Sequence, residues 1–104
     1  MELLTRLEEI ILLSIRRLRD EAYGVTINRE VSELMKKNYT MGSLYFSLDQ
    51  LYRKGLVDKC EGEPTPERGG RKKIYYSLTK KGERALQSVL ELHMKAWEKY
   101  EFGK

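Results

Sequence analysis

The sequence predicts a mainly helical α+β domain, a winged helix-turn-helix followed by a long C-terminal helix. Three observations favour this fold: helical periodicity in the first half of the chain, a short break between the second and third helical segments, and two strand-like segments around a loop that holds both prolines. With 104 residues the chain is the size of one domain. We expect residues 1–78 to form the winged domain and residues 79–104 the last helix, in one compact unit.

The first predicted helix spans about residues 5–19. Thr5 followed by Glu8 has the spacing of a capping box, which opens a helix. The segment is apolar on more than one side, and such a helix must be buried on more than one side. In so small a domain we expect one of these sides to meet a second subunit, and we assign Ile11 and Ile15 to that contact.

The second predicted helix spans about residues 24–37 and ends in Lys36 and Lys37, which suit a helix C-terminus. Asn38 follows and tolerates the left-handed conformation that ends many helices. About three residues then separate it from the third helix, which is the length of a helix-turn-helix connection. The residues expected to face inward are Ile27, Val31, Leu34 and Met35.

The third predicted helix spans about residues 41–54, with Thr40 as N-cap and Gly55 as C-cap. At about 100° per residue its apolar side, expected to enter the core, consists of Met41, Leu44, Leu48, Leu51 and Tyr52. A recognition helix presents its N-terminal residues to base edges in the major groove. We therefore expect DNA contacts from the opposite side, its flank and its cap: Thr40, Gly42, Ser43, Tyr45, Phe46, Gln50 and Arg53.

Particular side chains of this helix suit particular partners. Phe46 suits the methyl group of thymine, and Gln50 can pair with adenine. Asp49 either pairs with Arg53 four residues later or accepts a hydrogen bond from a cytosine amine. The alternative is that Tyr45 and Phe46 pack against the hairpin loop or a neighbouring subunit.

Strands are predicted at about residues 56–61 and 73–78, with Ile74, Tyr76 and Leu78 on one face. The net charge of +4 is concentrated near the second strand, because residues 68–84 hold seven lysines and arginines against one glutamate. Such a stretch indicates polyanion binding. We expect phosphate or minor-groove contacts from Arg68, Arg71, Lys72 and Lys73. The alternative is a solvated basic loop.

The last predicted helix is capped by Thr79 and runs to about residue 100. Its first turn contains Lys80 and Lys81, which oppose the helix dipole, so either a phosphate binds there or the helix tolerates the unfavourable charge. Apolar residues spaced four and three apart indicate a dimer seam. That stripe is Leu86, Leu90, His93, Trp97 and Tyr100. Trp97 either anchors the seam or lines a pocket for flat apolar molecules.

Several classes of protein are excluded by the sequence. The single Cys60 forms no internal disulfide, and one histidine with one cysteine leaves too few ligands for a closed zinc site. There is no catalytic or nucleotide-binding motif, so we expect neither an enzyme nor a cofactor. No apolar run reaches the roughly 20 residues that cross a bilayer, and the acidic N-terminus is unlike a signal peptide. We expect a cytoplasmic protein without a membrane partner.

Taken together, the motifs resemble those of the PadR family of bacterial and archaeal transcriptional regulators. The matching runs are residues 9–15, Tyr23-Gly24, residues 42–57 and residues 71–82. The single C-terminal helix is similar to the compact branch of this family. The resemblance implies a winged-helix homodimer that binds palindromic operator DNA, usually as a repressor, with the last helix joining the first in the dimer contact.

The resemblance also implies an effector site, because some compact members bind planar apolar drugs between subunits beside a tryptophan that matches Trp97. Two departures concern base preference and wing conformation rather than the fold. Phe46 stands where many members have proline, and the run from Gly70 to Lys73 lacks the proline often found there. The competing hypothesis is a winged helix that docks an acidic protein partner through the basic hairpin.

Overall fold

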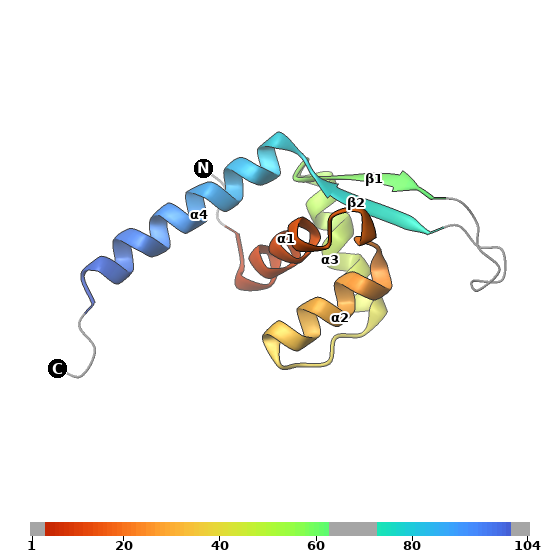
Figure 1. Cartoon of the computed structure of the whole chain (residues 1–104), viewed down its shortest axis with the longest axis horizontal. Helices are drawn as coiled ribbons and strands as arrows, with labels where there is room; N and C mark the ends of the chain where they lie inside the picture. The colour runs from red at the N-terminus through yellow and green to blue at the C-terminus, as the bar shows by residue number, and fades with distance from the viewer. Residues whose placement is uncertain (1–3, 63–72, 101–104) are drawn as a thin grey trace.

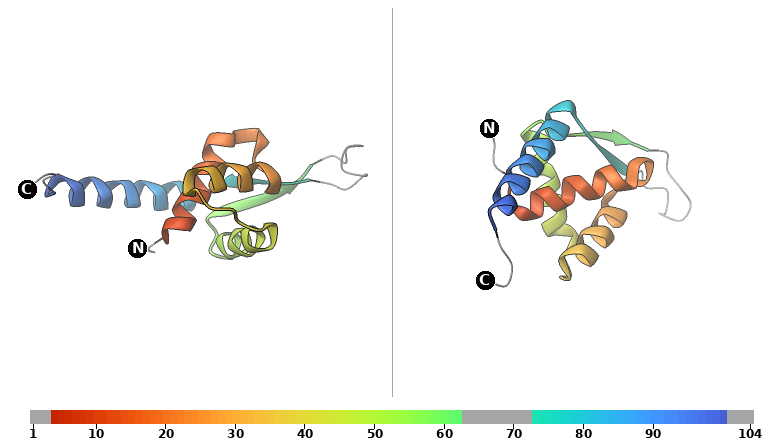
Figure 2. Two further views of the ribbon diagram at one scale, coloured as in Figure 1. Left: turned by 90° about the horizontal axis from the view of Figure 1, so that it is seen from below. Right: turned by 60° about the vertical axis from the view of Figure 1, so that its left-hand side comes forward.

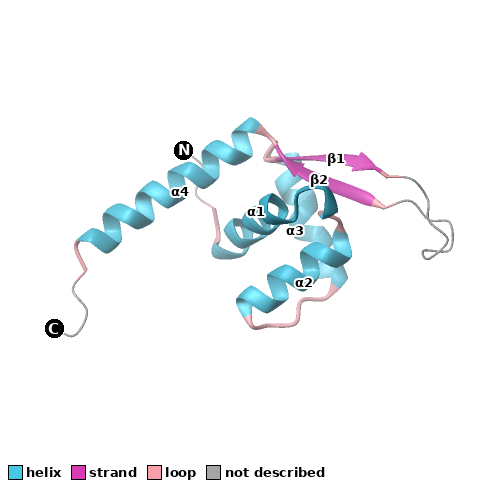
Figure 3. Ribbon diagram, viewed as in Figure 1, coloured by secondary structure: helices cyan, strands magenta, loops and turns pink. Residues whose placement is uncertain are grey.

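Within residues 4–62 and 73–100, which a computed structural model describes, the chain forms four α-helices, one short 3-10 helix and a two-stranded antiparallel hairpin (Figures 1 and 3). The elements in chain order are α1 (Arg6–Leu18), the 3-10 helix (Arg19–Glu21), α2 (Gly24–Met35), α3 (Met41–Arg53), β1 (Val57–Glu61), β2 (Ile74–Leu78) and α4 (Lys80–Glu98). This is the order of a winged helix-turn-helix with a C-terminal helix, so the predicted fold class is confirmed.

The helix α1 is the centre of the core. The predicted capping box opens it, because the Glu8 backbone N–H donates to Thr5 Oγ1 at 3.1 Å and the Thr5 N–H donates to Glu8 Oε1 at 2.9 Å. The helix lies against α2, α3, β2 and α4 of the same chain. Ile11 and Ile15 are consequently buried in the chain's own core. They are not available to a second subunit, so our assignment of these two residues to a subunit contact is corrected.

The helix-turn-helix is formed by α2 and α3. α2 ends two residues earlier than predicted, because Lys36 rather than Asn38 adopts the left-handed conformation, with φ of 54°. The connection therefore has five residues, 36–40, instead of three. Leu34, in the last turn of α2, is 47% exposed and does not pack on the core, contrary to the prediction, whereas its neighbour Met35 does pack on it.

The cap of α3 is as predicted, since the Ser43 N–H donates to Thr40 Oγ1 at 3.1 Å, and Gly55 follows the helix with φ of 77°. Leu44, Leu48 and Leu51 enter the core. Met41 and Tyr52, which the periodicity predicts to be inward-facing, are instead exposed at the edges of that side.

The hairpin pairs β1 with β2 in the register Val57 with Leu78 through Glu61 with Ile74. The predicted alternation is present: Tyr76 is buried, Ile74 and Leu78 pack on the core, and Ser77 is exposed. The hairpin and α4 project from opposite ends of the helical body (Figures 1 and 2). The radius of gyration is accordingly 15.5 Å, against about 13 Å for a compact domain of 100 residues.

The first half of α4 packs on α1, and Ala85 and Leu86 reach the edge of the core. Thr79 caps the helix as predicted, with the Gly82 N–H donating to its Oγ1 at 3.0 Å. The C-terminal end of the helix extends away from the body (Figure 2). Among the described helices, none has the length and apolar content needed to cross a membrane.

Candidate nucleic-acid interface

The N-terminal half of α3 presents an open face. Gly42 and Ser43 are exposed, and Phe46 is 67% exposed, more than any other large apolar residue among those that the structure describes. A Cβ placed at Gly42 would meet no atom within 4 Å. These predicted contact residues therefore form a surface that another molecule can approach closely.

Tyr45 has a different environment from Phe46. Its ring lies directly over Gly24 at the start of α2, where a Cβ would overlap the tyrosine hydroxyl and leave the Met41 methyl at 3.1 Å. Tyr45 remains 39% exposed. It therefore fixes the separation of α2 and α3 with one part of its ring and leaves the other part accessible.

The turn before α3 is held by a side-chain network. Asn28 Nδ2 donates to the Tyr39 carbonyl at 2.8 Å, and the Tyr39 N–H donates to Ser32 Oγ at 3.3 Å. Ser32 Oγ in turn donates to Asn28 Oδ1 at 3.5 Å. Because Thr40 comes next and caps α3, this network fixes the direction in which the helix begins. The periodicity of α2 gives no sign of it, since both side chains are small and polar.

Further along α3, Asp49 pairs with Arg53 at 3.0 Å, as one of the two predicted alternatives requires. Gln50 is half-buried. Burial raises the pKa of the Tyr76 hydroxyl, and Tyr45 and Asp49 raise it further. The Tyr76 hydroxyl therefore stays neutral at the base of the hairpin.

Lys59 on β1 is a cation beside α3 that the sequence pattern did not indicate. Its Nζ lies 4.2 Å from the ring centroid of Tyr52, so the lysine is held against the C-terminal half of the helix. Lys59 shares its face of β1 with the buried Val57 and lies opposite the buried Tyr76, so this face of the strand is turned towards the helices.

The described part of the predicted wing is its base. Arg68, Arg71 and Lys72 lie outside the described residues. Lys73 is described, and its Nζ lies 4.3 Å from the ring centroid of Tyr23. Lys73 is therefore the predicted wing cation whose position is known within the described residues, and it lies beside the start of α2.

The start of α4 has a structural explanation for its unusual sequence. Lys81 Nζ donates to the Lys54 carbonyl at 2.8 Å, where its charge suits the C-terminal end of α3. A Cβ at Gly82 would overlap the Leu56 carbonyl oxygen. Thr79 Oγ1 also donates to the Gly55 carbonyl at 2.7 Å. These contacts attach α4 to the end of α3, which favours a structural role for Lys81 and Gly82 over a phosphate site.

The predicted dimer residues of α4 divide into two groups. Leu86 packs against the core, whereas Leu90, Trp97 and Tyr100 are exposed, as is the neighbouring Met94. A groove of about 390 Å³ lies between α1 and α4, and Leu13, Leu86 and Leu90 form part of its wall. At the far end of the helix the rings of Trp97 and Tyr100 meet edge to face, 5.5 Å apart.

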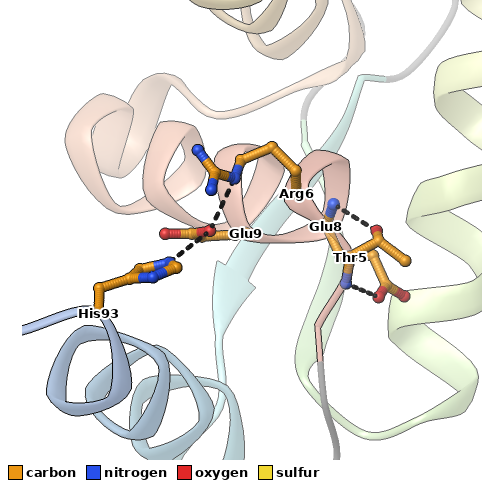
Figure 4. A network of polar contacts seen from close by, with 5 residues as sticks. All are labelled: Thr5, Arg6, Glu8, Glu9 and His93. Carbon is orange, nitrogen blue, oxygen red and sulfur yellow. Dashed lines mark hydrogen bonds and ion pairs between the residues drawn. The ribbon is translucent and has the colours of Figure 1, made fainter. Parts of the chain in front are cut away.

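His93 is one of the residues that line the α1–α4 groove, and its ring points towards Glu9 on α1 (Figure 4). Its Nε2 is 3.4 Å from Glu9 Oε1, which is also 3.4 Å from Arg6 Nε. The histidine therefore joins α4 to the first turn of α1.

Three comparisons place this geometry among known proteins. The model of the PadR-like family of transcriptional regulators matches residues 11–88. No match is found among curated proteins. Among solved structures, RosR of H. salinarum is 31% identical, with a TM-score of 0.72 over 94% of this chain and 81% of that chain.

Two further solved structures are similar. A PadR-like transcription factor from Bacteroides fragilis is 29% identical, with a TM-score of 0.72 over 88% of this chain and 84% of that chain. A PadR family transcription regulator from Clostridium difficile is 26% identical, with a TM-score of 0.62 over 88% of this chain and 91% of that chain.

Proposed function

Because the chain belongs to the PadR-like family of transcriptional regulators, we propose that it is a repressor that binds a palindromic operator in double-stranded DNA as a homodimer. In this proposal α3 enters the major groove and the basic wing holds the adjacent backbone. The observation that carries the proposal is the open N-terminal face of α3, where Phe46 is 67% exposed. The position of this exposed phenylalanine matches the base-contacting end of a recognition helix, where its ring suits contact with a thymine methyl.

The contacts on DNA divide into two kinds. Phe46, Ser43 and Gln50 read base edges, with Phe46 against a thymine methyl. The remaining contacts hold the backbone or the rim of the groove and come from Thr40, Gly42, Tyr45, Arg53, Arg68, Arg71, Lys72 and Lys73. To the latter group we add Lys59, because its ammonium is exposed and held beside α3.

We assign dimerisation to residues 79–104, packed with residues 1–78 as one unit. The support is the apolar side of α4 that the chain leaves uncovered, where Leu90 is 52% and Trp97 is 57% exposed. A small domain that exposes several large apolar side chains along one projecting helix is typical of a subunit whose partner covers them. A second copy of the chain satisfies this and supplies the twofold symmetry that a palindrome requires.

We assign a planar apolar effector to the neighbourhood of Trp97. The support is a shallow hollow of about 150 Å³ lined by Ala96, Trp97 and Tyr100. Drug-sized ligands occupy pockets of about 300–1,000 Å³, so one protomer supplies part of the site and a second copy supplies the rest. Quenching of Trp97 fluorescence by a planar dye, with release of bound DNA at the same concentrations, tests this assignment.

The test of the function is selection of bound sites from a pool of random duplexes at about 150 mM salt. We expect an inverted repeat whose half-sites lie about one helical turn apart. Binding without any sequence discrimination would favour the competing hypothesis, a cytoplasmic winged-helix module that docks an acidic protein partner. Neither hypothesis gives the protein a catalytic role.

A further inference from the structure

The backbone of residues 22–24 joins the hairpin to the helix-turn-helix. The Tyr76 N–H donates to the Ala22 carbonyl at 2.8 Å, and Tyr23 forms an antiparallel bridge with Tyr75. β2 is therefore bound along both edges, by β1 on one side and by residues 22 and 23 on the other. A two-stranded hairpin is marginally stable on its own, so this second edge contributes to holding it in place.

Side chains strengthen the junction where the hairpin leaves the body. The rings of Tyr23 and Tyr75 meet edge to face, with centroids 5.5 Å apart and planes at 63°. Lys73 Nζ lies 4.3 Å from the centroid of the Tyr23 ring. Edge-to-face aromatic pairs and cations over rings both have preferred geometries. This cluster, which we call the wing clamp, therefore favours one direction of the strand over others.

Gly62 completes the wing clamp at the end of β1. Its N–H donates to the Lys73 carbonyl at 2.7 Å, which closes the base of the hairpin. A Cβ at residue 62 would overlap the ring of Tyr75. The aromatic pair consequently has a defined position relative to both strands.

The same backbone segment also contacts α3. Tyr23 precedes α2, and its N–H donates to Thr26 Oγ1 at 3.0 Å. The next residue, Gly24, lies under the ring of Tyr45 on α3. Any movement of residues 22–24 would therefore displace the wing and the recognition helix relative to each other.

We propose that Tyr23 and Tyr75 are positioning residues for DNA binding, which set the direction of the wing relative to α3 so that both reach the same duplex. This inference rests on the proposed DNA-binding function. The two tyrosines act through the cations of the wing, and their own contact with DNA is not required. The aromatic ring of Tyr75 carries this role, because the contact with Tyr23 is made by the rings.

The test uses the full chain with Tyr75→Ser, and compares the salt dependence of its binding to the selected duplex with that of the unaltered protein. We expect the slope of log affinity against log salt to fall by about one unit for each phosphate that the wing no longer reaches, with the base preference unchanged. Tyr75→Phe keeps the ring and should restore the slope. Ser77→Ala, an exposed change in the same strand, is the matched control and should leave the slope unchanged.

A milder variant tests the same role if Tyr75→Ser does not fold, as judged by circular dichroism and thermal unfolding. Gly62→Ala displaces the Tyr75 ring without removing it. It should lower the slope in the same direction. A normal slope in the folded variant would overturn the inference.

A double-mutant comparison separates positioning from general destabilisation. Replacing Arg71 and Lys72 by alanine should weaken binding strongly in the unaltered protein and much less in the Tyr75→Ser protein, because that wing is already misdirected. Equal losses in both backgrounds would overturn the positioning role. If the unaltered protein binds no duplex, the proposed function itself fails, and the inference fails with it.

Discussion

Lys54 Nζ lies 2.6 Å from Glu8 Oε2 and joins the end of α3 to the first turn of α1. Burial opposes the charge on Glu8, but the hydrogen bonds from Lys54 and Thr5, together with the Lys54 charge, outweigh it and lower the pKa of the Glu8 carboxyl. The ion pair therefore stabilises the docking of the recognition helix on the core, and its contribution depends on pH.

The first prediction concerns that dependence. A carboxyl whose pKa is lower in the folded state stabilises the protein above its unfolded pKa, about 4.3, and loses this contribution as the pH falls through the folded value. We expect Glu8→Gln to lower the free energy of unfolding by about 1–3 kcal/mol at pH 7 and by progressively less below about pH 4. Urea unfolding at fixed protein concentration measures this. An equal difference at pH 7 and pH 3 would contradict the account.

The second prediction concerns a buried hydroxyl. Ser14 is fully buried in α1, and its Oγ has no hydrogen-bond partner among the described residues. Ser14→Ala should raise the free energy of unfolding by about 1–2 kcal/mol, because it removes an unsatisfied polar group and improves helix propensity. Thermal unfolding measures the change. Ser88→Ala in α4 is the control for propensity alone, and a Ser14→Ala protein less stable than this control would show that the hydroxyl has a partner.

The third prediction concerns base reading by Phe46. Because Phe46 is 67% exposed, Phe46→Ala should change the free energy of unfolding by no more than about 0.5 kcal/mol. It should relax the preference at one base pair of each half-site by about 1–3 kcal/mol. Repeating the selection of random duplexes with the variant measures this. An unaltered consensus would remove Phe46 from the base-reading residues.

The fourth prediction concerns the wing cations. The double variant Arg71→Ala with Lys73→Ala should weaken binding to all sequences alike and lower the salt slope by about one unit for each phosphate that is no longer bound. Titrations at several salt concentrations, on the selected duplex and on an unrelated one, measure both effects. Unchanged affinity and slope would show that the wing does not hold the backbone.

Local signals in the sequence predicted much of the fold. The caps at Thr5, Thr40 and Thr79 depend on bonds to backbone atoms three residues away, so residue type and spacing suffice to find them. The alternation of β2 was predictable for the same reason. The exposed face of α3 was predictable because the leucines that enter the core lie on the opposite side of the helix.

Contacts between distant parts of the chain were not predictable from one sequence. Periodicity showed that α1 is apolar on more than one side, but not that its own chain covers Ile11 and Ile15. The pairs Glu8–Lys54, Tyr23–Tyr75 and Tyr52–Lys59 join segments that only the fold brings together. The role of Lys81 at the end of α3 was missed because, from the first turn of a helix, we considered only a bound phosphate or a tolerated unfavourable charge.

The central claim is that two copies of the chain bind one duplex through symmetric half-sites. The most direct measurement compares the affinity of the protein for the selected inverted repeat and for the same repeat with about five base pairs, half a helical turn, inserted at its centre. Leu90→Glu, which places a charge on the exposed side of α4, serves as a dimer-deficient reference. We expect the insertion to lower the affinity of the unaltered protein at least about 100-fold, towards the affinity that the Leu90→Glu protein has for either duplex. Equal affinity for the two duplexes, with one chain bound to each, would contradict it.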